Sequence, residues 1–301
     1  MSYKKVVQIG ASGNTGSPIH DALIQSGKFE ITVLARNTSS FSSSNPIVKV
    51  VKIDFSNHQQ LVDALRGNDV VLLTFGDLPN LERNSKAIID AAIEAGVKRV
   101  IPSEFGVDTH SPTGRRQIVF DSKVKIDDYL EEKSNEGTIE FTSIYTGLFF
   151  DWRTQESQMF LGFDMENKRA TIYNGGTTPL NLTTLEALGA SVVSVLSTPA
   201  KFKNRRLRIC DLYASQRDIL ALLEAETGIK FVVEEMDANV LQDEGEAGLR
   251  KGDLSLSNVF GAILGATFAT NASRWSPDDD TASLGLAKQD LKAQVLKILQ
   301  P

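Results

Sequence analysis

Short apolar runs alternate with helix-length stretches of mixed polarity through the first half of the chain. The apolar runs lie at residues 6–9, 29–34, 47–53, 69–75, 97–101 and 138–144. Helix-length stretches follow four of them, ending near residue 26 and spanning 57–66, 81–95 and 118–133. Strands that are apolar throughout and alternate with helices are typical of a parallel sheet covered on both faces. Because parallel crossovers are right-handed, the pattern predicts an α/β fold with a doubly wound parallel sheet.

Polar residues at fixed spacing mark three helix starts. Ser56 with Gln59, and Thr183 with Glu186, have the spacing of a capping box, in which each side chain bonds to the backbone N–H of the other residue. Ser215 is a third N-cap candidate. We therefore expect helices to begin at these three positions.

The second half of the chain is less regular. The segment 237–253 is polar and is expected to form loops or solvated helix ends. The segment 258–272 comes closest to a membrane span, but it is shorter than the about 18 residues required and is rich in Gly, Thr and Asn. An apolar strand begins directly after Met-Ser-Tyr-Lys-Lys, so we expect no signal peptide. These features predict a cytoplasmic protein that does not bind membranes.

The charge and the scarcity of reactive side chains argue against several classes of protein. The 301 residues include 32 Lys and Arg against 38 Asp and Glu, a net charge of −6, whereas nucleic-acid binders carry a basic face. Cys210 is the only cysteine, so no disulfide forms within the chain. The three histidines are far apart and lack the spacing of a metal site. We therefore expect no nucleic acid and no metal, and demanding chemistry would need an organic cofactor.

A glycine-rich motif directly follows the first predicted strand. Gly10, Gly13 and Gly16 recur at steps of three and lead into the first predicted helix. In this context the first glycine permits a tight turn, the second lets a pyrophosphate approach the backbone, and the third lets the helix pack closely. Three polar side chains between them add possible donors: Ser12, Asn14 and Thr15. The motif predicts a dinucleotide site at the helix N-terminus.

The end of the second predicted strand indicates which dinucleotide binds. The strand ends at Arg36, a serine-rich segment follows, and no Asp or Glu occurs between residues 31 and 53. An acid here would bind the ribose 2′-hydroxyl of NAD, whereas an arginine can pair with the 2′-phosphate of NADP. We therefore expect NADPH as the cofactor. Thr74, Phe75 and Gly76 end the fourth strand and are expected to lie along the same cofactor.

Further motifs resemble a known family. Residues 91–99 (Ala-Ala-Ile-Glu-Ala-Gly-Val-Lys-Arg) lead into Ile-Pro-Ser-Glu-Phe-Gly at 101–106, and Phe-Asp-Ser-Lys follows at 120–123. With the glycine motif and Arg36, these segments are similar to the isoflavone reductase and phenylcoumaran benzylic ether reductase group, atypical short-chain dehydrogenases close to the NmrA-like proteins. The segment 146–152 (Thr-Gly-Leu-Phe-Phe-Asp-Trp) resembles fungal members in particular. The resemblance covers essentially the whole chain and is clearest over residues 1–152.

The resemblance assigns roles to residues after the fifth predicted strand. It implies that Lys123 is the catalytic lysine and that Ser103, Glu104 and Phe105 lie against the cofactor. A lysine suits this task, because a dry site and the positive charge of an oxidised nicotinamide both lower its pKa toward neutrality. Such a lysine can exchange a proton with a substrate oxygen.

The tyrosine of ordinary short-chain dehydrogenases is absent here, as it is in this family. It would lie four residues before Lys123, at Val119. Another Tyr-x-x-x-Lys occurs at Tyr129 and Lys133, in an acidic patch about two to three turns further along the helix. We interpret this second pattern as unrelated to catalysis. The missing tyrosine also makes an epimerase of the same fold a weaker hypothesis.

The second half is expected to shape the substrate pocket. We expect residues 1–152 to form an NADP-binding Rossmann domain and 153–301 a smaller α/β lobe, with segments such as 183–212 able to return to the first domain. Aromatic residues near the sixth strand are the pocket candidates: Tyr145, Phe149, Phe150, Trp152 and Phe160. Ser143 lies where the plant reductases of the family carry an Asn, and this departure argues against assuming their substrate preferences for this chain.

Two functions remain open. The first is an NADPH-dependent reductase of a small aromatic or conjugated secondary metabolite, with hydride from nicotinamide C4 and Lys123 as general acid/base. The alternative is a non-catalytic NADP(H)-binding redox sensor of the NmrA type. Because such regulators tend to lack the lysine, its presence favours the enzyme. A monomer or a homodimer is expected.

Overall fold

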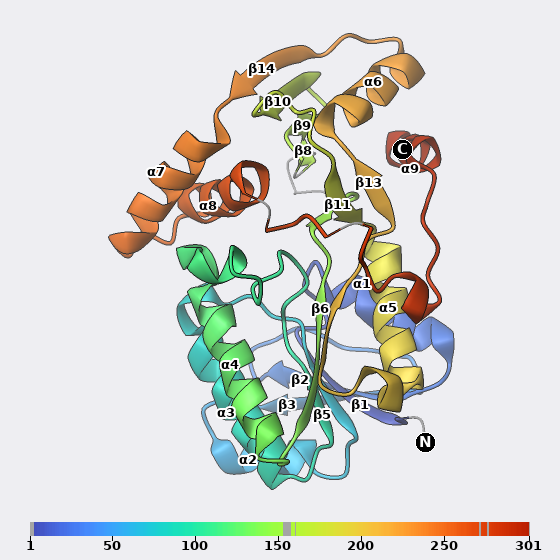
Figure 1. Ribbon diagram of the computed structural model, residues 1–301. Helices are drawn as coiled ribbons and strands as arrows, with labels where there is room; N and C mark the ends of the chain where they lie inside the picture. Colours follow the sequence, from blue (N-terminus) through green and yellow to red (C-terminus); the bar gives the residue numbers. More distant parts are fainter. Residues whose placement is uncertain (1–2, 153–157, 160, 271, 276, 301) are drawn as a thin grey trace. The chain divides into compact units, whose positions relative to one another are not determined.

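The computed structural model describes residues 3–152, 158–159, 161–270, 272–275 and 277–300 (Figure 1). The chain divides into two compact units, each assembled from separate segments. Unit 1 comprises residues 1–105, 122–144 and 188–207, and unit 2 comprises residues 106–121, 145–187 and 208–301. The functional division into a cofactor domain and a substrate lobe stays a prediction.

A seven-stranded sheet forms the centre of unit 1. Its strands are β1 (Lys5–Ile9), β2 (Glu30–Arg36), β3 (Val48–Ile53), β4 (Val70–Leu73), β5 (Arg99–Ile101), β6 (Glu140–Tyr145) and β12 (Arg205–Arg208). They follow the order β12-β6-β5-β4-β1-β2-β3, and every pairing from β3 through to β6 is parallel. The chain order reverses direction between β1 and β4, which is where doubly wound sheets bind ligands. The predicted doubly wound sheet is confirmed.

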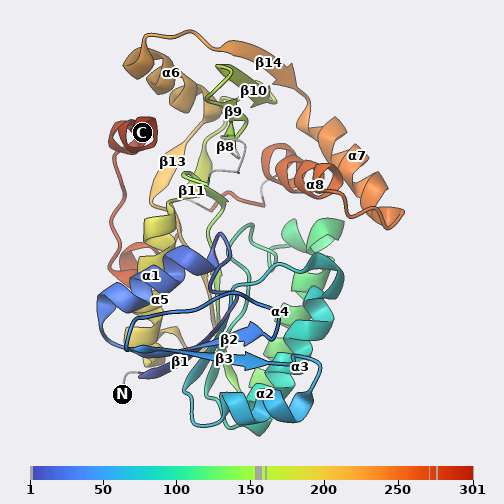
Figure 2. The same ribbon diagram turned by 180° about the vertical axis from the view of Figure 1, so that it is seen from behind.

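Helices cover both faces of this sheet (Figures 1 and 2). They are α1 (Gly16–Ser26), α2 (His58–Leu65), α3 (Leu81–Glu94), α4 (Asp121–Asn135) and α5 (Leu185–Ser197). Apolar side chains of α2, α3 and α4 share one core with Val7, Ile9 and Val71 of the strands. On the other face α1 and α5 pack closely, because a Cβ added at Gly189 would lie 2.7 Å from the Cβ of Ala22.

The cap of α2 differs from the prediction by one residue. Asn57, not Ser56, is the N-cap, and its side chain accepts a hydrogen bond from the Gln60 backbone N–H at 3.1 Å. The Ser56 hydroxyl instead donates to the Asp54 carboxylate at 2.7 Å. Two adjacent residues could cap the same helix, and the neighbouring carboxylate decided between them.

The other two predicted caps had different outcomes. Thr183 belongs to strand β11 (Leu180–Thr183), so its assignment as the cap of α5 is wrong. Thr184 serves instead, because its hydroxyl oxygen accepts from the Ala187 backbone N–H at 3.1 Å. The cap at Ser215 is confirmed, with a full capping box to Asp218.

Unit 2 contains two small sheets. One has the strand order β14-β10-β9-β8 and the other β13-β11-β7. The strands not yet introduced are β7 (Leu148–Phe149), β8 (Gln158–Met159), β9 (Phe163–Asp164), β10 (Arg169–Tyr173), β13 (Leu212–Ala214) and β14 (Val232–Met236). The helices are α6 (Gln216–Thr227), α7 (Ala238–Arg250), α8 (Leu256–Ala269) and α9 (Leu291–Leu299).

The polar segment 237–253 forms a helix rather than loops, which corrects the prediction. The resulting helix α7 packs closely against α8 through small residues. A Cβ added at Gly245 would lie 2.5 Å from the Ala262 backbone N, and one at Gly265 would lie 2.4 Å from the Gln242 Cβ. Where glycines form the contact between two helices, the contact face has few large apolar side chains. The periodic apolar pattern that predicts a helix from sequence is then weak.

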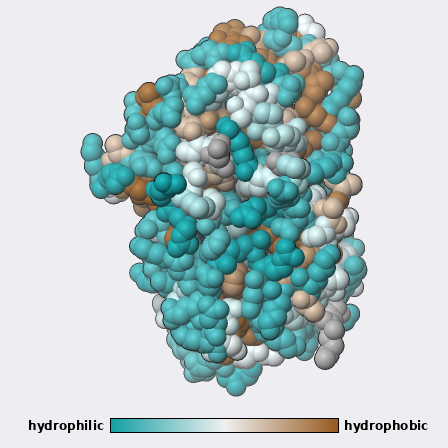
Figure 3. All heavy atoms as spheres, viewed as in Figure 1, coloured by the Kyte–Doolittle hydropathy of each residue, from teal (hydrophilic) through white to brown (hydrophobic). Residues whose placement is uncertain are grey.

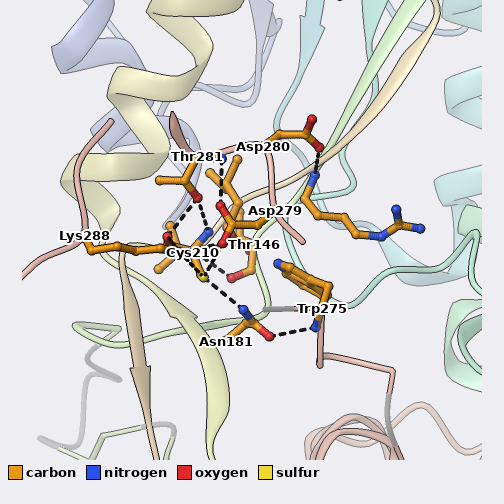
Figure 4. A network of polar contacts seen from close by, with 11 residues as sticks. Thr146, Asn181, Cys210, Trp275, Asp279, Asp280, Thr281 and Lys288 are labelled. Atoms are coloured by element: carbon orange, nitrogen blue, oxygen red, sulfur yellow. Dashed lines mark hydrogen bonds and ion pairs between the residues drawn. The ribbon is translucent and has the colours of Figure 1, made fainter. Parts of the chain in front are cut away.

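A polar network in unit 2 surrounds Cys210 (Figure 4). The Lys288 Nζ lies 2.6 Å from the Asp279 carboxylate and 2.9 Å from the Cys210 Sγ, and the Asn181 Nδ2 lies 2.9 Å from the same sulfur. The Thr281 hydroxyl accepts from the Cys210 backbone N–H and donates to its carbonyl. Burial is the main cause that raises the pKa of the Cys210 thiol, so the thiol is neutral near pH 7. The network ties the segment before α9 to the strands of unit 2.

Apolar side chains also reach the surface of unit 2. Leu256 is 72% exposed and Val232 of β14 is 60% exposed. In Figure 3 apolar patches interrupt a largely hydrophilic face, some of them where β14 runs. Within the described part of the chain, no helix combines the length and the apolar character that crossing a membrane requires.

Candidate functional site

The turn between β1 and α1 requires glycine at two positions, even without a ligand. Gly10 has a φ of +96°, and a Cβ there would lie 2.7 Å from the Thr74 carbonyl oxygen. A Cβ at Gly16 would lie 2.0 Å from the Gly10 carbonyl oxygen. Both positions therefore need glycine so that the strand, the turn and the helix can meet.

Gly13 is different, because packing within the chain does not require it. A Cβ there would come no closer than 3.4 Å to another atom, and its φ is not in the left-handed region. The N-cap of α1, Thr15, forms no side-chain cap bond, and the first turn contains no acid. Two N–H groups here are already used, since Gly13 donates to the Gly10 carbonyl at 3.1 Å and Ser17 donates to the Gly13 carbonyl at 2.8 Å. The positive end of the α1 dipole still favours an anion at this turn, and the absent Cβ of Gly13 leaves it room to approach.

A cavity of about 530 Å³ opens beside this turn within unit 1. Its volume lies in the range of small-molecule sites. Sixteen residues line it: Ile9, Gly10, Ala11, Ser12, Val33, Leu34, Ala35, Arg36, Ser39, Phe41, Phe55, Phe75, Gly76, Asp77, Asn84 and Ile88. The cavity therefore lies at the carboxyl ends of β1, β2 and β4, where the strand order reverses.

Five of the predicted cofactor residues line the cavity and five others lie in adjoining segments, whereas Ser103, Glu104, Phe105 and Lys123 are not among the lining residues. Those in the lining are Gly10, Ser12, Arg36, Phe75 and Gly76. Thr74 is buried, and both its backbone N–H and its hydroxyl donate to the Ile9 carbonyl oxygen at 2.9 Å. Gly13, Asn14, Thr15 and Gly16 lie in the adjoining turn and helix start, outside the lining.

Several lining residues were not predicted. Phe41, Phe55 and Ile88 supply apolar walls, and Asn84 supplies an amide. Phe41 comes from the serine-rich segment after β2, and Asn84 from the first turns of α3. Only the position of these segments after the carboxyl ends of neighbouring strands could have indicated them.

Arg36 is the one basic residue among the described residues that line the cavity. Arg36 is exposed at the end of β2 and lines the cavity. The Ser39 backbone N–H donates to the Arg36 carbonyl at 2.8 Å, and the Lys52 ammonium donates to the Ser39 carbonyl. Asp77, the one acid among the lining residues, follows β4 instead. A negatively charged ligand group is therefore favoured beside Arg36.

Lys123 lies at the start of α4 and reaches the loop after β5. Its ammonium donates to the carbonyl oxygen of Glu104, which is buried. Burial lowers the pKa of Lys123, while the Glu104 carboxylate acts in the opposite direction. Phe105 has a φ of +31°, an uncommon value for a residue other than glycine. A lysine with a lowered pKa, held by a strained loop, is typical of a functional site.

The second Tyr-x-x-x-Lys pattern has the opposite character. Tyr129 donates its hydroxyl to Asp90, and burial is the main cause that raises its pKa to about 12. The Lys133 Nζ lies 3.0 Å from both Glu132 and Glu136, and these hydrogen bonds raise its pKa. Both shifts oppose activation for proton transfer, which supports the interpretation that the pair is structural.

The predicted substrate residues belong to unit 2. Tyr145 and Phe149 are buried, and the Phe149 ring stacks on Trp152 with centroids 5.2 Å apart. Phe150 packs in the core of the unit. Phe160 lies outside the described residues. Their role in binding substrate stays a prediction.

Comparison with known sequences places this site in a family context. The model of the NmrA-like family matches residues 2–250. Oxidoreductase aprR of Aspergillus flavus is 35% identical over 252 residues, which are 83% of this chain and 83% of that protein. Isoflavone reductase of Glycine max is 27% identical over 248 residues, covering 74% of this chain and 76% of that protein.

Comparison with solved structures supports the fold. The binary complex of leucoanthocyanidin reductase from Vitis vinifera with NADPH superimposes with a TM-score of 0.78. The match covers 98% of this chain and 100% of that one, at 16% sequence identity. The family match, the related sequences and the shared fold agree with the motifs in the sequence, and the chain belongs to the NmrA-like family.

Proposed function

We propose that the protein is an NADPH-dependent reductase of a small aromatic or conjugated metabolite. The observation that carries the proposal is the cavity of unit 1, which joins a glycine turn open to a pyrophosphate at Gly13 with a cationic end at Arg36. The names of the relatives, an oxidoreductase and an isoflavone reductase, support the same class of reaction.

The residues of the cavity fit the parts of NADPH. The backbone N–H groups of the turn and of the α1 start would bind the pyrophosphate. Arg36 would pair with the 2′-phosphate, a group that NADH lacks. Phe41, Phe75 and Ile88 offer apolar surface for the adenosine. When bound, the cofactor supplies a hydride from C4 of its nicotinamide.

Lys123 would act as the general acid/base. Burial lowers its pKa, which makes the amine a better proton donor than an exposed lysine. Its hydrogen bond to the Glu104 carbonyl fixes the direction of the side chain. In this proposal Lys123 protonates the oxygen on which negative charge develops, or assists a leaving group. Ser103, Glu104 and Phe105 would position the lysine and the nicotinamide end.

The substrate class rests on relatives and on aromatic side chains. Isoflavone reductase and leucoanthocyanidin reductase are named after aromatic compounds. Among the candidate residues of unit 2, Trp152 is partly exposed and would supply matching aromatic surface, and the buried Phe149 that stacks on it would hold it in place. The alternative is an NADP(H)-binding regulator without turnover. Such a protein would not need a lysine whose pKa is lowered by burial.

Oxidation of NADPH followed at 340 nm with a panel of enones, carbonyl compounds and benzylic ethers tests the proposal. We expect at least one aromatic compound to be reduced, and Lys123→Ala to lose about 100-fold or more in kcat while binding NADPH normally. Unchanged turnover in Lys123→Ala would remove the lysine from the mechanism. NADPH binding without reduction of any compound would favour the regulator.

A further inference from the structure

A glutamine lies where the central strand of unit 1 would be expected to carry an apolar residue. Gln8 of β1 is 0% exposed, between Val7 and Ile9 in a strand paired on both sides. A buried amide costs free energy unless its donor and its acceptor are both satisfied. Its presence in an apolar strand therefore needs an explanation.

Both ends of the Gln8 amide are satisfied by helix α1. The Nε2 donates to the Gly16 carbonyl oxygen at 2.8 Å, and the Oε1 lies 2.8 Å from the His20 Nδ1. Because the amide oxygen can only accept, the network assigns the His20 proton to Nδ1. Gly16 and His20 are one helical turn apart on the buried face of α1, so one side chain holds the whole first turn.

His20 extends this connection to the cavity. Its ring meets the Phe41 ring edge-on, with centroids 5.7 Å apart and an interplanar angle of 80°. Phe41 lines the cavity beside Ser39. Gln8 and His20 therefore contact both the helix start that adjoins the glycine turn and the aromatic wall, without lining the cavity themselves.

We propose that Gln8 and His20 are positioning residues for the dinucleotide. The pair holds the start of α1, and with it the adjoining glycine turn, in the position proposed for the pyrophosphate, and it holds Phe41 as a wall of the same cavity. This inference rests on the proposed NADPH site. It predicts that loss of the pair weakens cofactor binding even where the fold is as stable as before.

The test separates positioning from stability with a stability-matched variant. Gln8→Leu leaves the His20 N–H without its acceptor, so it should lower both stability and affinity. In the double variant Gln8→Leu/His20→Phe both side chains of the pair are apolar, so only the Gly16 carbonyl loses its Gln8 donor and the loss of stability should be smaller than in Gln8→Leu. Thr142→Val is the control, because it removes a buried hydrogen bond of β6, from the Thr142 hydroxyl to the Phe202 carbonyl at 2.7 Å, away from the cavity.

Isothermal titration with NADPH and thermal melts are measured on all four proteins. We expect the Kd for NADPH to rise by about tenfold in Gln8→Leu and in the double variant, and to stay unchanged in Thr142→Val. A double variant with the wild-type melting temperature and the wild-type Kd would overturn the proposal. If the wild-type protein binds no NADPH in the same titration, the proposed function is wrong, and this result is distinct from an unchanged Kd in the variants.

A second measurement needs no variant to fold. Long-range ¹H–¹⁵N spectra of the wild-type protein report the His20 tautomer, and the chain has only two other histidines to distinguish. We expect a proton on Nδ1 and a shift of the His20 signals when NADPH binds. A proton on Nε2, or signals unmoved by saturating NADPH, would contradict the positioning role.

Discussion

Gly13 and Gly16 belong to the same turn but differ in how much space surrounds them. Packing within the chain requires Gly16, since its added Cβ would overlap the Gly10 carbonyl oxygen. Gly13 has ordinary space around it. The fold therefore does not require glycine at position 13, which agrees with its proposed role beside the pyrophosphate.

Replacing Gly13 by alanine should weaken NADPH binding by about tenfold or more, because the methyl group occupies space meant for the pyrophosphate. The melting temperature should change little. Gly16→Ala is the matched control and should lower the melting temperature strongly, since its Cβ would lie 2.0 Å from a carbonyl oxygen. Titration calorimetry and thermal melts measure both effects. Wild-type affinity in Gly13→Ala would contradict the placement of the pyrophosphate.

The lowered pKa of Lys123 has a consequence for stability. Burial disfavours its charged form, so between the lowered pKa and the ordinary value of 10.5 the folded protein binds fewer protons than the unfolded chain. The contribution of Lys123 to stability therefore rises with pH in this window. We expect Lys123→Met to be the more stable protein at pH 7, with an advantage that shrinks as the pH approaches 10. Urea denaturation across this pH range measures the difference, and a constant difference would argue against a lowered pKa.

The sequence shows candidate site residues one at a time, but it does not show which neighbours the fold gives them. The glycine spacing, Arg36 and Lys123 follow local patterns that a sequence displays directly. Phe41 and Asn84 come to the cavity only through the way loops and helices follow neighbouring strands. Ser56 and Asn57 are adjacent and either could be the N-cap of α2. Asn57 is the cap, because the Ser56 hydroxyl donates to Asp54 instead.

Helix α4 is joined to strand β12 by a buried ion pair. Asp127 is 0% exposed, and the Arg206 guanidinium meets its carboxylate with Nε at 3.0 Å and Nη2 at 2.9 Å. Arg206 also reaches Glu131 one turn later, at 3.1 Å. The helix therefore owes part of its position to an arginine about 80 residues away in sequence, a partner that no local pattern reveals.

Arg206→Leu should lower the free energy of unfolding by about 3 kcal/mol, because it removes the partner of a buried carboxylate. Arg169→Leu is the control, since Arg169 pairs with Glu234 on the surface at 3.2 Å and should cost less than about 1 kcal/mol. Urea denaturation of both variants measures the two values. Equal losses in the two variants would mean that the buried Arg206–Asp127 ion pair stabilises the fold no more than a surface ion pair does.

The elements of unit 1 could be predicted from the sequence, and those of unit 2 only in part. Apolar parallel strands and amphipathic helices have clear periods, which is why β1 to β6 were expected close to where they lie. Strands of two or three residues, such as β7 and β13, are too short to show a period. The helix pair α7 and α8 relies on glycine contacts, which a hydrophobic pattern does not register.

At the scale of the whole chain, both units are assembled from segments that are distant in sequence. In unit 2 the network around Cys210 holds such a segment in place (Figure 4). Lys288 is its centre, because its ammonium contacts the Asp279 carboxylate and the carbonyl oxygen and sulfur of Cys210.

Lys288→Met should cost about 2 kcal/mol in the free energy of unfolding, since it removes charge-assisted hydrogen bonds to largely buried groups. The control is Lys292→Met, whose ion pair with Glu226 at 2.8 Å has a more exposed carboxylate (22% against 6% for Asp279) and should contribute less than about 1 kcal/mol. Chemical denaturation compares the two. A loss in Lys288→Met no larger than in the control would show that the network does not hold the segment.

The central claim is that the cavity of unit 1 binds NADPH in preference to NADH. Titration calorimetry of the wild-type protein with each dinucleotide under the same conditions tests it most directly. The predicted result is a Kd for NADPH lower than that for NADH by about tenfold or more, because only NADPH carries the 2′-phosphate that Arg36 can pair with. Equal or tighter binding of NADH, or no binding of either, would contradict the claim.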